Sequence, residues 1–331
     1  MRESDKWKFW TVAGLLPPLV LLSVVLGSVS IPIDSMWSGA LTDTERLIVL
    51  DSRLPRTLTA LLGGGALALS GLFMQTLFRN PLAGPSVLGL TSGASLAVAA
   101  VTLAGGTAAV AQWSVVTAAV VGAGVVLVFI LFAAQRFSDV TAVLIVGLML
   151  GFFASALVSL LQSFSDRVSL QAYVFWGFGT FGNVTRASMP VYAVPLLVVM
   201  AISPVWIKAL NSLLPGEAHA KTMGVNIRRL RFALMGATGV MVGVVTAFCG
   251  PVAFIGLAAP HLARFIFRTV NHRVILPFSM IMGAVMALGC DIIARLPGLD
   301  AALPLNTVTA FMGAPVVIYL ILSGRARTIS V

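Results

Sequence analysis

The sequence predicts an all-α integral membrane protein that crosses the bilayer with ten helices. Hydrophobic residues make up 59% of the chain and charged residues only 10%. So few charges cannot cover the surface of a soluble protein. Apolar segments follow one another with short connections, and no polar stretch is long enough to form a linker or a second domain. Residues 1–331 are therefore expected to form a single transmembrane domain.

Ten segments have the length and hydropathy of membrane spans. A helix needs about 20 apolar residues to cross a hydrocarbon layer of about 30 Å. The expected spans are 9–30, 54–78, 87–105, 113–134, 139–163, 190–208, 230–249, 252–267, 275–296 and 305–323. The first is too long for the apolar part of a signal peptide, so it is expected to remain as a helix. The weakest is 252–267, which is short and carries Pro260, His261 and Arg264 near one end.

The distribution of basic residues predicts the orientation. The net charge of +10 would suggest nucleic-acid binding in a soluble protein, but here the basic residues are spread through short loops. With ten spans and both termini in the cytoplasm, most of the 21 Lys and Arg residues fall inside, as the positive-inside rule expects. The outer exceptions are Arg46, Arg53, Arg56, Arg167, Arg186 and Arg295. The chain is therefore expected to contact membrane lipid and not to bind nucleic acid.

The stretch 53–96 is expected to cross the membrane, turn and start back. It opens with RLPR and a glycine-rich apolar run, and then reaches RNPLAGP. Pro81 and Pro85 must end the helix, because proline lacks the N–H donor and clashes with the preceding turn. No strand precedes the GGG run, so its small residues are interpreted as packing surfaces between helices and not as a phosphate loop.

A short helix is expected on the outer side, within the connection 162–190. The segment LQAYVFWGFG is too short to span the bilayer and apolar enough to lie at its surface. Its aromatic residues fit the interfacial belt of a membrane protein. Two interpretations remain open, a simple anchor at the interface or a gating helix over a vestibule.

A second short helix is expected on the inner side, within the connection 211–232. The segment EAHAKTMG is helix-like and closed by Gly224, and the basic run IRRLR follows it. The connection could be a plain linker whose arginines bind anionic lipid. It could equally be the contact for a soluble partner protein.

Ionisable residues inside the spans are few. Asp291 and Arg295 are four residues apart near the outer end of the ninth span, a spacing that favours a mutual ion pair. No chain of buried carboxylates appears, which argues against a proton-coupled carrier. Cys249 and Cys290 are interpreted as small buried hydrophobic residues, and the three histidines, His219, His261 and His272, show no metal-ligand spacing.

No enzyme motif is found. The chain has no GxxxxGK[ST] sequence, so it has no loop for a nucleotide phosphate. If transport is driven by ATP, then the ATPase is another chain, and ATP and Mg would be bound there. No cofactor is expected in this chain.

A series of motifs extends over nearly the whole sequence. In chain order they are RLPR, ALSG, RNPLAGP, GEAHAKTMGVN, GPVAFIGLAAPHLARF, ARLPG and LPLNTVTAFMGAPVVIYLIL. In this order they resemble the FecCD-type, or type II, permeases of ABC importers for iron chelates, haem and cobalamin. The resemblance implies a ten-helix permease fold in a bacterial cytoplasmic membrane. It also implies two permease copies, or a homologous partner permease, two ATPase subunits and a solute-binding protein, either periplasmic or lipid-anchored.

The resemblance also implies roles for particular residues. Those expected to dock the binding protein are Arg53, Arg56 and Arg295. Those expected to couple to the ATPase are Glu217, Ala218, Ala220, Gly224, Arg228 and Arg229. Those expected to line the cytoplasmic gate are Asn80, Leu82, Val140 and Thr141, where Val140 departs from the small polar residue of the cobalamin permease. Those expected on the outer gating helix are Leu170, Tyr173, Phe175 and Trp176.

The sequence thus predicts the permease subunit of an ABC importer for an iron(III)-siderophore or a related metal chelate. Cobalamin and haem are the alternatives within the family, because the expected path is apolar and the selective contacts belong mainly to the binding protein. The alternative from another class is a carrier or channel that acts alone, coupled to protons.

Overall fold

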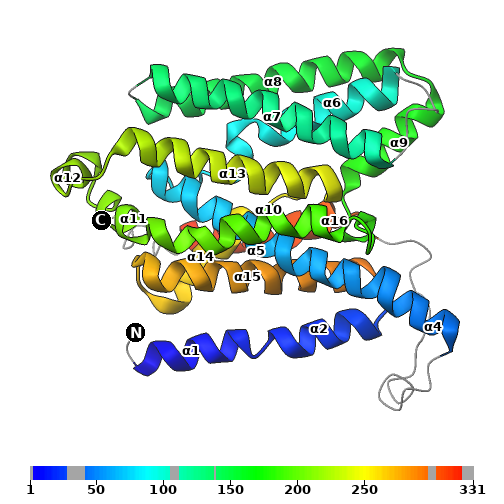
Figure 1. Cartoon of the computed structure of the whole chain (residues 1–331), viewed down its shortest axis with the longest axis horizontal. Coiled ribbons are helices and arrows are strands. Elements are labelled where there is room, and N and C mark those ends of the chain that lie inside the picture. Colours follow the sequence, from blue (N-terminus) through cyan, green and yellow to red (C-terminus); the bar gives the residue numbers. More distant parts are fainter. Residues whose placement is uncertain (1–2, 28–41, 105–111, 138, 297–302, 323–331) are drawn as a thin grey trace.

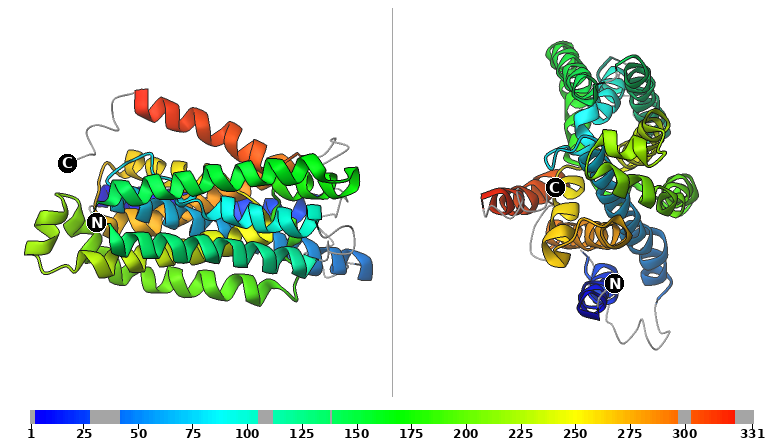
Figure 2. Two further views of the ribbon diagram at one scale, coloured as in Figure 1. Left: turned by 90° about the horizontal axis from the view of Figure 1, so that it is seen from above. Right: turned by 90° about the vertical axis from the view of Figure 1, so that its left-hand side faces the viewer.

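The computed structural model describes residues 3–27, 42–104, 112–137, 139–296 and 303–322, and all the regular structure in these ranges is helical. The outer layers are α1 (Glu3–Ala13) with α2 (Leu16–Val25) on one side, and α6 (Leu90–Ala104), α7 (Gln112–Arg136) and α8 (Val140–Phe164) on the other. Between them lie α5 (Leu54–Leu77), α13 (Ile227–Cys249), α14 (Ile255–Phe267) and α15 (His272–Ala294) (Figure 1). Figure 2 shows α16 (Leu305–Leu322) on one side of this body and α10 (Met189–Ile202) with α11 (Ile207–Leu213) on the other.

The ten predicted spans are all present as helices. Seven stretches of the described chain are long and apolar enough to cross a membrane, and α6, α14 and α16 are the three shorter apolar helices. The fold class expected from the sequence is therefore confirmed.

Helix α5 forms the centre of the molecule, since most of its residues are buried. Glycines allow its neighbours to approach: a Cβ placed on Gly64 would overlap the backbone of Gly283 in α15, and one on Gly71 would overlap the backbone of Gly256 in α14. In a bilayer such close contacts replace the hydrophobic effect as a source of helix association. The expectation that these glycines serve packing is confirmed.

The second span begins earlier than its predicted start at residue 54. A capping box formed by Thr42 and Glu45 begins α4 (Asp43–Leu47), and a π-helical turn, η1 (Ile48–Arg53), joins it to α5. Proline inside a helix removes one hydrogen bond and crowds the preceding turn. The wider π turn in front of Pro55 accommodates both effects, so the helix continues through RLPR.

The eighth span begins later than predicted, at Ile255 instead of residue 252. Residues 250–254 are not helical, and Phe254 has a positive φ of 64°. Pro260 does not end α14, which continues to Phe267. The carbonyl that Pro260 leaves unpaired belongs to Gly256, and Gly71 of α5 packs directly against it. His261 therefore lies inside the helix.

Candidate functional site

A polar network lies at the end of the molecule that is predicted to face outward, around the fully buried carboxylate of Asp291 in α15. Arg295 Nη2 lies 2.7 Å from one carboxylate oxygen, and Arg56 Nη2 lies 2.8 Å from the other. Arg56 also donates through Nε at 2.9 Å. The predicted pair between Asp291 and Arg295 is confirmed, and the structure adds Arg56 from α5. Buried charges need such close partners, because they have lost their hydration.

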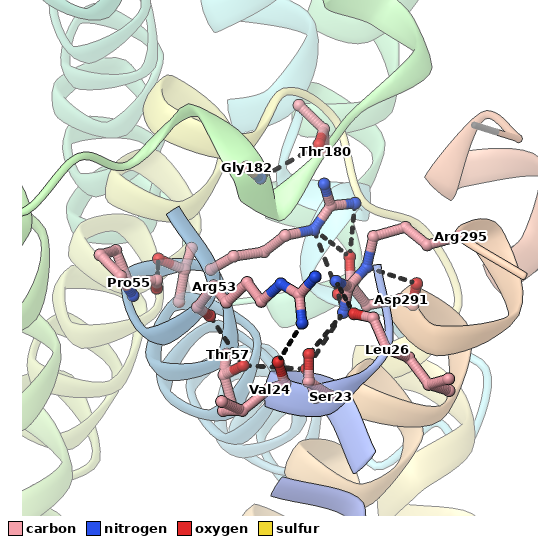
Figure 3. A network of polar contacts seen from close by, with 12 residues as sticks. Ser23, Val24, Leu26, Arg53, Pro55, Thr57, Thr180, Gly182, Asp291 and Arg295 are labelled. Carbon is pink, nitrogen blue, oxygen red and sulfur yellow. Dashed lines mark hydrogen bonds and ion pairs between the residues drawn. The ribbon is translucent and has the colours of Figure 1, made fainter. Parts of the chain in front are cut away.

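The same arginines bind the end of α2. Arg53 Nη1 donates to the carbonyl oxygens of Val24 and Val25, at 2.9 and 2.6 Å, and Arg295 donates to Leu26 O and Ser23 Oγ (Figure 3). The last carbonyls of a helix have no partners inside it and carry its negative dipole end. The arginines therefore hold the first span to α5 and α15.

These contacts bear on the predicted docking role of Arg53, Arg56 and Arg295. The structure does bring the three residues together, but it turns them inward. Arg53 is only 4% exposed, while the Arg56 and Arg295 side chains are 20% and 11% exposed. Three guanidinium groups around one carboxylate leave this network with an excess of positive charge. Docking remains a prediction, and Arg56 is the member that offers most surface.

The predicted outer helix is α9 (Arg167–Phe178). Asp166 caps it by accepting hydrogen bonds from the N–H groups of Ser169 and Val168, and these bonds hold the pKa of the carboxyl below its usual range. Tyr173 is buried and Phe175 is 58% exposed. Leu170 and Trp176 are half-buried. The helix is confirmed, and its role as anchor or gate is untested.

The predicted inner gate lies where α5 ends. Asn80 Oδ1 accepts a hydrogen bond from Leu82 N at 2.9 Å, and the Leu82 side chain is half exposed. The loop is held from α14, where His261 Nε2 donates to Pro81 O at 2.7 Å. The sequence analysis named His261 but did not predict this anchoring role, because the contact becomes visible only when α14 is placed against the loop.

The other half of that gate lies at the start of α8. Val140 opens the helix, although its side chain lies outside the described part of the structure, and Thr141 N donates to Asp139 Oδ1 at 2.9 Å. The turn η2 (Pro85–Leu88) packs on α8 at Gly147, less than two helical turns from Thr141. The turn that follows the first half of the predicted gate thus packs on the helix that begins with the second half.

The predicted inner helix is α12 (Glu217–Thr222). Ala220 is fully buried, Glu217 forms an ion pair with Arg231, and Gly224 adopts the left-handed φ of 79° that closes the helix. Ala218, Arg228 and Arg229 are exposed. The two arginines, with Gln135 and Phe232, line a hollow of about 350 Å³. This surface therefore combines a buried contact at Ala220 with exposed side chains that are accessible to a partner.

The two ends of the molecule are different. Figure 1 shows α12 at one end, together with the start of α1, and α4 at the other. The Asp291 network lies at the α4 end, because its Arg56 is at the start of α5, which follows α4 and η1 in one continuous stretch. The end of α16 also lies on the α12 side (Figure 2). Both described ends of the chain are thus on the side of the predicted coupling helix.

A buried polar cluster near the inner end was missed by the sequence reasoning. Arg264 Nη1 donates to Gln75 Oε1, and Gln75 Nε2 donates to Leu257 O at 3.1 Å. His272 shares hydrogen bonds with Thr76 Oγ1 and Asn211 Oδ1 at 2.9 and 2.8 Å. The signal was the position of Gln75 and Arg264 within apolar spans, where polar groups are costly.

No metal site is found in the described ranges, which contain no group of three or more His, Cys, Asp or Glu side chains that could hold an ion. The predicted burial of Cys249 and Cys290 is confirmed, and both thiols are free. Cys249 Sγ lies 4.0 Å from the hydroxyl of Tyr192. The polar contacts described above join separate helices.

The described chain is thus a helical membrane body with a charged network at one end and a short helix with exposed residues at the other. The sequence pattern of the FecCD transport family matches residues 15–323. The chain belongs to this family, and it is the multi-pass permease component of an ABC importer of the inner membrane.

Two relatives extend over the whole chain. The vitamin B12 import system permease protein BtuC of Klebsiella pneumoniae is 39% identical over 332 residues, with 98% of this chain and 96% of that protein covered. BtuC of Escherichia coli O9:H4 is 38% identical over 329 residues, covering 98% and 97%. The similarity therefore includes both the outer and the inner ends described above.

Two solved structures have related folds. An inward-facing metal-chelate type ABC transporter has a TM-score of 0.84 and 31% identity, with 95% of this chain and 98% of that chain covered. PsaBC from Streptococcus pneumoniae in complex with Fab has a TM-score of 0.53 and 15% identity, covering 87% and 93%. The second similarity concerns the fold alone.

Proposed function

We propose that this permease imports vitamin B12 or a closely related corrinoid. The observation that carries the proposal is the match to vitamin B12 permeases at 37–39% identity over 98% of the chain. A large amphiphilic cargo also fits a body that holds few charged groups within its spans. This choice refines the sequence-based expectation, which put an iron(III)-siderophore first and cobalamin or haem as alternatives.

We propose that the energy comes from two copies of an ABC ATPase that bind at the α12 end. The exposed residues Ala218, Arg228 and Arg229, beside the buried Ala220, offer a firm surface for such a partner. ATP and Mg would bind to the ATPase subunits. This arrangement puts α12, and with it both termini, in the cytoplasm.

We propose that a solute-binding protein delivers the cargo at the opposite end. The excess of positive charge around Asp291 favours a partner with acidic residues, and complementary charge speeds encounter and sets orientation. A second copy of this chain, or a homologous permease, would complete the path between the two halves. Helix α9 would narrow the outer mouth, while Asn80, Leu82, Val140 and Thr141 would narrow the inner one.

Transport then requires two states of the permease pair, one with the path open to the outer side and one with the path open to the inner side. The binding of ATP must favour one state over the other, because a ligand with equal affinity for both states shifts neither. The rigid attachment of Ala220 and the Glu217–Arg231 pair would transmit a displacement of α12 into α13. The inner gate loop would follow through α14, which holds Pro81 by way of His261.

The second candidate cargo is an iron chelate. It is favoured by the 31% identity and the TM-score of 0.84 to a metal-chelate type transporter. The selective contacts would then lie mainly in the binding protein, so the permease alone would accept either cargo.

Uptake by reconstituted vesicles tests the proposal. The permease, the ATPase and the binding protein encoded beside it are placed in liposomes, and uptake of labelled cyanocobalamin is compared with that of a labelled ferric siderophore. We expect ATP-dependent uptake of cyanocobalamin. Uptake of the siderophore alone would contradict the cargo, and uptake by the permease without any ATPase would contradict the importer and favour a carrier that acts alone.

A further inference from the structure

Residues 250–254, the connection between α13 and α14, are a non-helical segment inside the membrane domain. Helix α13 ends at Cys249, and Gly250 follows with a φ of 73°. At Phe254 the chain makes a tight γ-turn, in which Ile255 N donates to Ala253 O at 2.8 Å. A positive φ at a phenylalanine is a strained conformation that the surrounding structure must enforce.

The contacts of its two ends place this segment deep in the bilayer. At one end, Cys249 contacts Tyr192, whose hydroxyl donates to Thr59 O of α5 at 3.0 Å. At the other end, Gly256 packs on Leu67 and Gly71 of the same helix. With a rise of about 1.5 Å per residue, Thr59 lies about 8 Å inside the outer end of α5 and Gly71 about 9 Å inside its inner end. The segment therefore passes through the middle of the membrane.

Several backbone groups of this segment have no partner within the described part of the chain. Ala253 N donates to Asn306 Oδ1 at 3.2 Å, and Phe254 O accepts from the helix that follows. The unpaired groups are the N–H groups of Val252 and Phe254 and the carbonyl oxygens of Gly250, Pro251 and Val252. Non-helical backbone is tolerated at membrane depth only where protein buries it or where it lines a water-filled cavity.

Burial among the described residues accounts for Gly250, which is buried, and Gly179 packs against the carbonyl of Pro251. It does not account for the rest of the segment, because Pro251, Val252, Ala253 and Phe254 are each half-buried, unlike the fully buried Ile255 that follows. Unpaired polar groups on a partly open surface cannot face lipid, because hydrocarbon offers no hydrogen bonds. Water, or a solute that replaces it, is the environment that satisfies them.

The neighbours of the segment are the elements that the transport cycle needs. Gly250 lies against the carbonyl of Trp176 at the end of α9, and Phe254 packs on Gly313 of α16. Gly256, just beyond the segment, lies against the ring of Pro85 next to the inner gate loop. The segment thus connects the outer short helix with the inner loop, along the side of the body where α16 lies (Figure 2).

We propose that residues 250–254, together with Asn306, form a wall of the aqueous path through the permease and bind the cargo in passage. The unpaired groups include both donors and acceptors and no charge. They suit amide or hydroxyl groups on the rim of a large uncharged solute, which would exchange hydrogen bonds with the wall while its apolar parts face the side chains. This proposal rests on the proposed importer function, and it adds the place where the cargo touches the chain.

Cysteine accessibility tests the wall directly. Three valines are changed to cysteine, one at a time. Val252 lies in the segment, Val128 lies on the exposed side of α7 and is 68% exposed, and Val245 lies in the core of α13 and is 1% exposed. The assembled transporter in liposomes is treated with a charged, membrane-impermeant methanethiosulfonate. Because such a reagent attacks hydrated thiolates, we expect V252C to react at least about tenfold faster than V128C and V245C.

The parent chain sets the baseline, since its own Cys249 and Cys290 are buried. If V252C reacts no faster than V245C, then a second copy seals the segment and the proposal is wrong. The labelling needs no cargo, so this result is independent of whether vitamin B12 is the solute. A transporter that shows no ATP-driven uptake before labelling would count against the proposed function and would leave the accessibility result standing.

A second measurement uses the label as a removable obstacle. After V252C has folded and assembled, the attached bulky group should reduce cyanocobalamin uptake at least about tenfold, and a thiol reductant should restore it by thiol–disulfide exchange. Reversal excludes a folding defect. Full uptake by the labelled V252C transporter would contradict a wall that touches the cargo.

Discussion

Asp291 is the residue on which the outer end of the molecule depends most. Its carboxylate is fully buried and bonded to Arg56 and Arg295, and these arginines would face each other across the site without it. A buried ion pair is strongly destabilising to break, because the remaining charge keeps the cost of burial and loses its compensation. The carboxylate therefore positions the arginines as well as neutralising part of their charge.

We expect Asp291→Asn to lower the free energy of unfolding by about 3 kcal/mol, since two partly buried guanidinium groups lose their counter-charge. The matched control is Asp51→Asn, because Asp51 is exposed and lies 4.0 Å from the exposed Arg186. An exposed pair of this kind contributes at most about 1 kcal/mol. Unfolding of both purified variants in detergent, titrated with SDS, measures the difference. Equal losses would show that the network carries no special stability.

At the scale of elements, α12 depends on the turn that ends it. Gly224 has a φ of 79°, and a Cβ there would meet no other atom within 4 Å. The constraint at this position is therefore one of backbone conformation and not of space. Proline has a φ near −65° and cannot adopt it, whereas asparagine tolerates the left-handed region.

We expect Gly224→Pro to abolish assembly with the ATPase while the permease still inserts into the membrane, because α12 can no longer be presented by the turn. Gly224→Asn is the matched control and should retain most of the assembly. Co-purification of the ATPase with tagged permease gives the readout, with membrane insertion checked by extraction and gel filtration. Normal recovery of the ATPase with the proline variant would remove α12 from the coupling interface.

At the scale of the whole molecule, the distribution of charge gives each end its own kind of partner. Arg53 is committed to α2, so reversal of its charge would disturb the fold together with any docking surface. Arg56 combines a place in the network with 20% side-chain exposure. It is therefore the member of the network with the most surface to offer a partner, although its substitution also removes one partner of Asp291.

We expect Arg56→Gln to weaken capture of the binding protein about tenfold at low salt, with the difference disappearing as salt screens the charges. The control is Arg186→Gln, which removes an outer arginine with a side chain that is 75% exposed. Titration of fluorescent binding protein against the permease in nanodiscs, at two salt concentrations, checks the expectation. Unchanged affinity at low salt, or an equal loss in the control, would exclude docking at the Asp291 network.

What the sequence determined by itself was the class of the fold and the order of its parts. Apolar segments of bilayer length predicted the spans, and positions such as Gly224 and the Asp291–Arg295 spacing predicted local geometry. These features follow from contacts between residues near one another in the chain, which a period or a motif can express. The ordered motifs also indicated the family.

The tertiary structure alone decided which distant residues meet. The attachment of α2 to Arg53, the contact of Arg56 with Asp291 and the anchoring of Pro81 by His261 join separate helices. It also decided that residues 250–254 are not helical, although their apolar side chains resemble the start of a span. A sequence pattern records hydropathy and spacing, but the pairing of backbone groups deep in a membrane depends on which neighbours surround them.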